Sequence, residues 1–444
     1  MVLPLRDGSV AYDGRVSPSP PFRGWRIVGL GLIANAIGAG VLGAYAFMVT
    51  PLIEEFGATP AQLGLGMSIT IASMALASPI LGRILDRGRL RLTMLSGVLV
   101  MLVAMGLLSR GQALWQLAVC LSAVAIGLAM FGMLPAKVLI VNWFVRKRGR
   151  ALAIAFAGTS LAGFVMPPIT AWLIELFSWR TALVWIALGA AALATPAIAF
   201  FAIRRPEDIG QYPDGDPAPP GGAEEVVSPR LPHGRIVRDR NFWVLGVGDA
   251  LAMSVPVATG LFFVRHLEEV GIPRTTIALV MPLMACCSLA GKLTVGTLAD
   301  RVNPRLLAIA MLVLHVIGLW IVAVGTGVTA MIVAALPIGF GGGGFFPLPS
   351  VLQGRCFGRL IIGQVSGLHS LLGLPLLLVS APLTGMVAAS TGSFLVPFVC
   401  LGLLQLLAAG ILVFLRVPDE EPSISLFVGE PPRADPLAVP SATP

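Results

Sequence analysis

The chain has 444 residues, of which 56% are hydrophobic and only 12% are charged, and its formal net charge is +8. A soluble protein carries roughly twice that share of charged residues, so this composition excludes a globule surrounded by water alone and places lipid around the chain. The basic excess does not indicate nucleic acid, because no basic run carries interleaved aromatic residues; it is expected in the cytoplasmic loops of a membrane protein.

Twelve apolar stretches follow one another along the chain, each near the ~20 residues that cross a bilayer. The first six are predicted at 25–49, 62–82, 92–109, 114–140, 151–174 and 181–203. The second six are predicted at 241–264, 276–297, 306–325, 329–352, 362–388 and 393–416. The predicted fold class is therefore an all-α membrane protein with two pseudo-symmetric six-helix bundles, residues 25–203 and 241–416.

The polar segments complete the predicted organisation. Residues 1–24 and 417–444 are predicted to be tails, and the Pro-rich stretch 204–240 is predicted to be a linker rather than a domain. Because the number of spans is even, both termini share one side, and 24 of the 30 Lys and Arg fall on that side. The positive-inside rule makes that side cytoplasmic. Few lysines beside many arginines are consistent with a bacterium of high GC content, so we expect the inner membrane.

A short motif occurs twice, at an offset of 214 residues. The pattern Gly-x-x-x-Asp-Arg follows the second and the eighth predicted span, at Gly82, Asp86 and Arg87 and at Gly296, Asp300 and Arg301. Glycine allows a helix end to approach another backbone closely, and the aspartate can accept from loop donors or cap a helix of the neighbouring bundle. A basic loop with an incidental aspartate is the alternative. Two copies at equivalent positions favour a conformational latch.

With these features the chain resembles the major facilitator superfamily, whose members have two six-helix halves and this signature after the second and eighth helices. Three further stretches are similar to its monocarboxylate porter and oxalate–formate antiporter branch: Gly24-Trp25, Trp143-Phe144 before Arg148-Gly149, and Arg205-Pro206-Glu207-Asp208. The resemblance covers residues 25–416. It implies a secondary transporter of small organic anions, chiefly monocarboxylates, that works by alternating access with proton symport or anion exchange. The rival within the fold is proton-coupled efflux of drugs or metabolites.

Lys292 is the main candidate for binding an anion. It lies eight residues before Asp300 in the span 276–297, roughly 12 Å from the cytoplasmic end at a rise of about 1.5 Å per residue. A cation at this depth is costly, so it either anchors a substrate or pairs with a carboxylate, and we favour the substrate. The resemblance implies a substrate-anchoring cation here, usually arginine. Lysine supplies a point charge instead of a bidentate fork.

Asp249 lies at about the same depth in the neighbouring span 241–264. We expect Asp249 and Lys292 to form a charge pair that substrate or a proton breaks, which would make Asp249 the proton-coupling residue. Mammalian members of the branch carry an acid one turn before the cation. That position is Ser288 here, so the proton role is not carried over from the resemblance.

Four other side chains are candidates for the central cavity. His369 is either a second anion ligand or a packing residue, and Lys137 either reaches the membrane surface or lines the cavity opposite Lys292. Asn35 and Tyr45 of the first span are weaker candidates.

Prolines and glycines predict weak points in three spans, where helical hydrogen bonds are lost. They are Pro135, Pro167, Pro168, Gly341 to Gly344, Pro347 and Pro349. No motif of a membrane enzyme is present, and the five cysteines lack metal-ligand spacing, so we expect no catalysis, no cofactor and no metal. The expected partners are the organic anion, a proton and the bilayer, and we expect a monomer.

Overall fold

The computed structural model describes residues 21–217 and 233–418, and the regular structure in these ranges is helical. The first half contains α1 (Gly24–Phe56), α2 (Pro60–Asp86), α3 (Leu90–Leu108), α4 (Leu114–Phe131), α5 (Met133–Trp143), α6 (Arg148–Leu176) and α7 (Trp179–Phe201). The second half contains α9 (Arg240–Glu269), α10 (Arg274–Leu298), α11 (Pro304–Val324), α12 (Val328–Phe345), α13 (Leu348–Phe357), α14 (Ile362–Thr391) and α15 (Leu395–Val413). Between them lie η1 (Pro206–Ile209), η2 (Pro213–Gly215) and α8 (His233–Ile236).

The predicted number of spans is confirmed. Within the described ranges, 12 helical stretches are long and apolar enough to cross a membrane, with α4 and α5 counted as one span and α12 and α13 as another. The chain is therefore an all-α, multi-pass membrane protein. Most of the predicted tails 1–24 and 417–444, and residues 218–232 of the predicted linker, lie outside the described residues.

Two spans at equivalent positions in the halves are interrupted. The fourth span breaks at Gly132, whose φ of −81° and ψ of −127° are not helical. The tenth span breaks at Phe346 and Pro347, between the end of α12 and the start of α13. These are two of the three spans in which weak points are predicted. In the third, α6 continues through Pro167 and Pro168 without interruption. The helices that follow the breaks, α5 and α13, contact each other across the two bundles through Lys137 and Gln353.

Side chains at the loop ends define where several spans begin. Thr59 forms a capping box with Gln62 at the start of α2, and Ser178 accepts a backbone N–H of α7. Asp239 and Asn303 do the same for α9 and α11. Each cap satisfies donors that the helix itself leaves unpaired, which fixes where the helix starts at the membrane surface.

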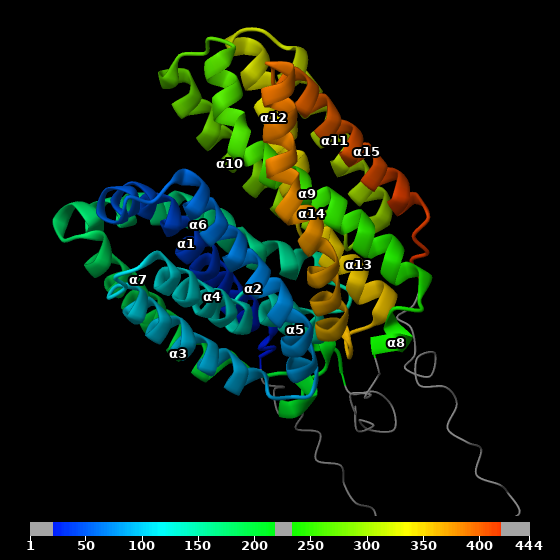
Figure 1. The fold of residues 1–444 in the computed structure, drawn as a ribbon. Helices are drawn as coiled ribbons and strands as arrows, with labels where there is room; N and C mark the ends of the chain where they lie inside the picture. Colours follow the sequence, from blue (N-terminus) through cyan, green and yellow to red (C-terminus); the bar gives the residue numbers. More distant parts are fainter. Residues whose placement is uncertain (1–20, 218–232, 419–444) are drawn as a thin grey trace, which may run out of the picture.

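The two bundles have separate apolar cores and contact each other chiefly through two helix pairs. One large buried cluster belongs mainly to α1–α7, and two smaller clusters belong to α9–α15. Across the interface, α2 packs on α14 and α6 packs on α10, which relates the halves by their pseudo-symmetry. Figure 1 shows the bundles spreading apart at one end and meeting at the other, near α5 and α13. We call the end where they meet, which carries the loops 87–89 and 299–303, the latched end.

Candidate functional site between the bundles

Lys292 of α10 lies at the interface of the two bundles and is only 6% exposed. Its Nζ donates to Thr159 Oγ1 and to Ser160 Oγ, both at 2.7 Å, and these hydroxyls belong to α6 of the other bundle. The ring of Phe346, at the break between α12 and α13, has its centroid 5.0 Å from the same nitrogen. The ammonium is thus held by two neutral oxygens and one aromatic face.

The Lys292 ammonium has no carboxylate within ion-pair distance among the described residues. Two hydroxyls and a ring compensate a buried positive charge only in part, since removal from water costs several kcal/mol even after relaxation. The expected ion pair with Asp249 is therefore wrong for this conformation. What the geometry leaves is a buried cation that an incoming anion would neutralise.

Lys137 of α5 takes part in a different network, closer to the latched end. The residue is 7% exposed, and its Nζ donates to Gln353 Oε1 of α13 at 3.1 Å. The same oxygen accepts from Ser366 Oγ at 2.8 Å. Gln353 Nε2 lies 2.8 Å from His369 Nδ1, and His369 Nε2 lies 3.0 Å from the carbonyl oxygen of Phe242. Lys137 therefore ties α5 to three helices of the second bundle.

This network determines the protonation state of His369. A carbonyl oxygen only accepts, so His369 Nε2 carries a proton toward Phe242. Lys137 only donates, so the amide of Gln353 turns its oxygen to Lys137 and its NH₂ to His369 Nδ1. Nδ1 must then accept, and the imidazole is neutral with both nitrogens occupied. In this conformation His369 positions Gln353 and offers no positive charge to an anion.

Asp249 of α9 lies near Lys137 instead of Lys292. The charges of Asp249 and Lys137 interact, whereas no carboxylate in the described part of the chain acts on Lys292 in this way. One oxygen of Asp249, Oδ1, is buried and has no hydrogen-bond partner among the described residues. The site thus holds two cations at two levels, Lys292 against α6 and Lys137 with Asp249 beside α13.

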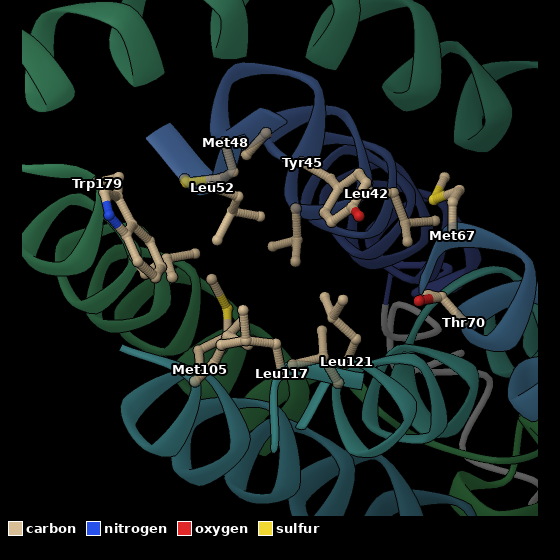
Figure 2. A pocket seen from close by; sticks show the side chains of 15 residues that line it. Leu42, Tyr45, Met48, Leu52, Met67, Thr70, Met105, Leu117, Leu121 and Trp179 are labelled. Carbon is tan, nitrogen blue, oxygen red and sulfur yellow. The ribbon is translucent and has the colours of Figure 1, made fainter. Parts of the chain in front are cut away.

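The two candidates of the first span do not contact Lys292. Asn35 is 2% exposed, and its Nδ2 donates at 2.8 Å to Gly31 of its own helix. Tyr45 lines a cavity of about 40 Å³ inside the first bundle, and its hydroxyl donates to the Leu63 carbonyl at 2.9 Å (Figure 2). The hydroxyl of Thr70 in the same cavity also donates to a backbone carbonyl, at Gly66. That cavity is apolar and provides nothing to bind a charge.

The aspartates of the repeated motif cap helices of the opposite bundle. Asp86 accepts from the backbone N–H groups of Gly363 and Gln364, at 3.0 and 2.8 Å, where α14 begins. Asp300 likewise accepts from Gly149 and Arg150, at 2.6 and 3.0 Å, where α6 begins. A carboxylate there pairs unsatisfied donors and the positive end of the helix dipole. The motif thus joins the bundles twice, by the same chemistry.

The Asp300 carboxyl and the arginines of the motif lie in different surroundings. Burial raises the pKa of the Asp300 carboxyl, and the N–H groups of Arg150 and Gly149 and the charge of Arg355 act in the opposite direction. The two backbone donors and this arginine therefore favour the ionised form at this loop. The arginines of the motif, Arg87 and Arg301, are exposed beside the loops, where they can lie at the phosphate layer.

The glycines of the motif lie where the two backbones touch. A Cβ at Gly82 would lie 2.1 Å from the Gly363 carbonyl oxygen, and one at Gly296 would lie 2.2 Å from the Cβ of Ala153. Neither position has room for a larger side chain, since these neighbours are backbone or short side chains. The close approach of α2 to α14 and of α10 to α6 depends on these two residues.

A polar contact at the same end involves the central segment after α7. Glu207 of η1 forms an ion pair with Arg359 at 2.7 Å, and both side chains are less than one-fifth exposed. Arg359 follows α13, so this pair also crosses between the bundles. Nearby, Asp214 of η2 accepts from the backbone N–H groups of Val145, Arg146 and Lys147, at 2.8–3.2 Å, just before α6. The segment around Glu207 and Asp214 therefore helps to hold the latched end together, a role that the sequence analysis did not predict.

The residues that sequence reasoning missed are the neutral partners of the charged ones. Thr159, Ser160 and Gln353 each contact a buried lysine of the opposite bundle. Their signal was weak but present: they are polar side chains in otherwise apolar spans. Such residues are also common where they merely bond their own helix, so polarity alone does not distinguish the two roles.

Comparison with known proteins gives one family and one fold. The model of the Major Facilitator Superfamily matches residues 28–265 and 250–440. Monocarboxylate transporter 13 of Bos taurus is 24% identical over 415 residues, which cover 90% of this chain and 91% of that protein. Two solved structures share the fold. The fucose:proton symporter FucP of E. coli, in the outward conformation, has a TM-score of 0.65 at 15% identity, covering 88% of this chain and 99% of its own. The human organic anion transporter MFSD10 has a TM-score of 0.62 at 15% identity, with 88% and 100% covered.

Proposed function

The chain belongs to the major facilitator superfamily and is a transporter, not an enzyme, and from this we propose that it carries small organic anions, chiefly monocarboxylates, by alternating access. One observation supports the substrate class above all: the buried Lys292 ammonium lies between the bundles with no carboxylate partner among the described residues. The name of the relative from Bos taurus agrees with an anionic substrate.

The membrane orientation follows from the arginines. We place the latched end in the cytoplasm, because the loop after α2 is flanked by Arg83, Arg87, Arg89 and Arg91. Both termini then lie in the cytoplasm, and the membrane is the inner membrane of a bacterium. On this assignment the bundles are closed toward the cytoplasm, so the described conformation faces outward and Lys292 is reached from outside.

The transport cycle uses the contacts that join the bundles. Each hydrogen bond to a charged group contributes about 1.5–3 kcal/mol at most, so two capped helix starts and one ion pair are a reversible closure. An anion on Lys292 neutralises the ammonium at the contact between α10 and α6, and opening toward the cytoplasm then requires release of Asp86 and Asp300. Conformations that differ by a few kcal/mol interconvert readily, as alternating access requires.

The proposed substrate class is tested by uptake into proteoliposomes. Labelled acetate, pyruvate and lactate are offered with and without an imposed pH gradient, and we expect saturable uptake of at least one. Stimulation by inward acidity indicates proton symport, whereas stimulation only by preloaded anion indicates exchange. Flux of a cationic drug without uptake of any carboxylate would overturn the substrate class and favour the efflux alternative.

Asp249 remains the proposed proton-coupling residue, with Lys137 as its partner. Replacing Asp249 with asparagine keeps the shape but removes the group that binds the proton. We expect pH-driven accumulation to fall about tenfold or more, since symport then lacks its proton site. Exchange of labelled against unlabelled anion, measured at equal pH on both sides, should continue.

The matched control for that experiment is Glu175→Gln at the exposed end of α6. It removes a carboxylate that contacts neither lysine and should leave both assays at wild-type rates. Full pH-driven accumulation by Asp249→Asn would rule out a coupling role for this carboxylate.

A further inference from the structure

The two hydroxyls that hold Lys292 are not equivalent. Thr159 Oγ1 accepts from Lys292 and donates its own proton to the Phe156 carbonyl oxygen at 2.8 Å. Ser160 Oγ accepts from Lys292 at 2.7 Å but has no acceptor for its proton among the described residues. The Thr159 hydroxyl therefore already donates its proton, while the Ser160 hydroxyl can still donate its proton to a ligand beside the buried cation.

Lys292 also keeps a donor in reserve. An ammonium has three N–H groups, and two are directed at Thr159 and Ser160. The remaining contact is the face of Phe346, whose centroid lies 5.0 Å away. The Nζ atom of the buried Lys292 and the Oγ atom of the half-buried Ser160 lie 2.7 Å apart, and each keeps one hydrogen, so the two groups can donate to the two oxygens of one carboxylate.

We propose that the Ser160 hydroxyl is the donor of the first bundle to the substrate carboxylate, acting together with the Lys292 ammonium of the second. This rests on the proposed function. One carboxylate oxygen accepts from Lys292 and the other from Ser160, while Thr159 positions the ammonium without contacting the anion. Hydrogen bonds to ionised groups are stronger than neutral ones, and more so where water is scarce.

A carboxylate bound by Ser160 and Lys292 would link the two bundles and would be preferred over neutral analogues. Because Ser160 lies on α6 and Lys292 on α10, one bound carboxylate bridges the two bundles at the point where they touch. Esters and primary amides of the same acids are neutral and have no anionic oxygen to accept from Lys292 and Ser160. They are expected to be poor substrates even when they fit the available space.

The test compares KM for a labelled carboxylate among variants reconstituted in proteoliposomes. The probe is whichever of acetate, pyruvate and lactate the wild-type protein carries fastest. Ser160→Ala is expected to raise KM about tenfold or more, the effect of losing one hydrogen bond to a charged group. Ser160→Thr, which keeps the hydroxyl, should restore KM. Thr159→Val removes a hydroxyl that positions Lys292 but no donor to the anion, so it is expected to raise KM less than Ser160→Ala does.

The control is Ser122→Ala on α4, whose hydroxyl donates only to the Ala118 carbonyl of its own helix at 2.9 Å. It should leave KM unchanged. A wild-type KM in Ser160→Ala, or a change in maximal rate alone, overturns this inference and leaves the proposed function intact. If the wild-type protein carries none of the three acids, the proposed function fails and this inference fails with it. Should Ser160→Ala not insert, Ser160→Cys, with its weak thiol donor, takes its place and is expected to raise KM as well.

Discussion

Replacing Lys292 with alanine is expected to reduce carboxylate uptake at least about a hundredfold. The ammonium is the one charge directed at the proposed anion site, and loss of one member of a desolvated charge pair costs about 3 kcal/mol or more, which corresponds to a factor of about 100. Initial uptake rates in proteoliposomes measure this directly. Lys292→Arg keeps the charge and should retain a measurable part of the activity, with a changed KM because a planar fork replaces a point charge.

The control for this variant is Lys147→Ala, which removes an exposed lysine side chain at the latched end. Near-normal uptake in this control shows that loss of any positive charge is not sufficient to stop transport. If Lys292→Ala keeps wild-type uptake, the buried cation does not bind the substrate. The argument for an anion then ends, and only membership in the transporter family remains.

Replacing Gly82 with leucine is expected to open the latched end. A Cβ at this position would overlap the Gly363 carbonyl oxygen, which lies only 2.1 Å away and belongs to backbone that cannot turn aside. Overpacking costs about 1–3 kcal/mol, which would shift a two-state population by about 5- to 150-fold toward the conformation in which α2 and α14 separate. Distances between spin labels on the two bundles, measured at both ends of the molecule, report this shift.

The second copy of the motif supplies a replicate and another glycine supplies a control. Gly296→Leu should give the same change through contact with Ala153, since the two copies join the bundles in the same way. Gly106→Leu on α3 adds the same side chain where no atom lies within 4 Å of its Cβ, and should leave the distances unchanged. Unaltered distances in Gly82→Leu would show that this contact does not hold the conformation.

Features that depend on residues near one another in the chain were predicted better than contacts between residues far apart in it. The apolar stretches predicted twelve spans, and the structure confirms that number, because the length and hydropathy of a span are local properties. The boundaries are less exact: the first span continues past its predicted end at residue 49 to Phe56. The repeated motif also led to the expectation that its aspartates can cap helices of the neighbouring bundle, and Asp86 and Asp300 lie at such helix starts. The role of the motif as a latch stays a prediction until the glycine variants are measured.

The pairing of charged side chains was not predictable in the same way. Equal depth along two neighbouring spans led to the expectation that Asp249 meets Lys292. In the structure Lys292 instead reaches hydroxyls more than 130 residues earlier in the chain, while Asp249 interacts with Lys137. Depth specifies only the height of a residue in the membrane. The direction of its side chain around the helix axis, and the helix that it meets, remain open.

For this protein the sequence by itself determined the class of fold, the number of spans and the repeated motif, and it predicts the sidedness from the arginines. These depend on composition and spacing within one stretch of chain, or on two copies of one motif. The tertiary structure alone decided that no carboxylate of residues 21–217 or 233–418 pairs with Lys292, that His369 is neutral, and that Thr159 and Ser160 are the hydroxyls at the cation. Those facts arise where α5 and α6 meet α10, α13 and α14. Contacts between the two bundles depend on the rotation and tilt of every helix involved, and no local pattern encodes these.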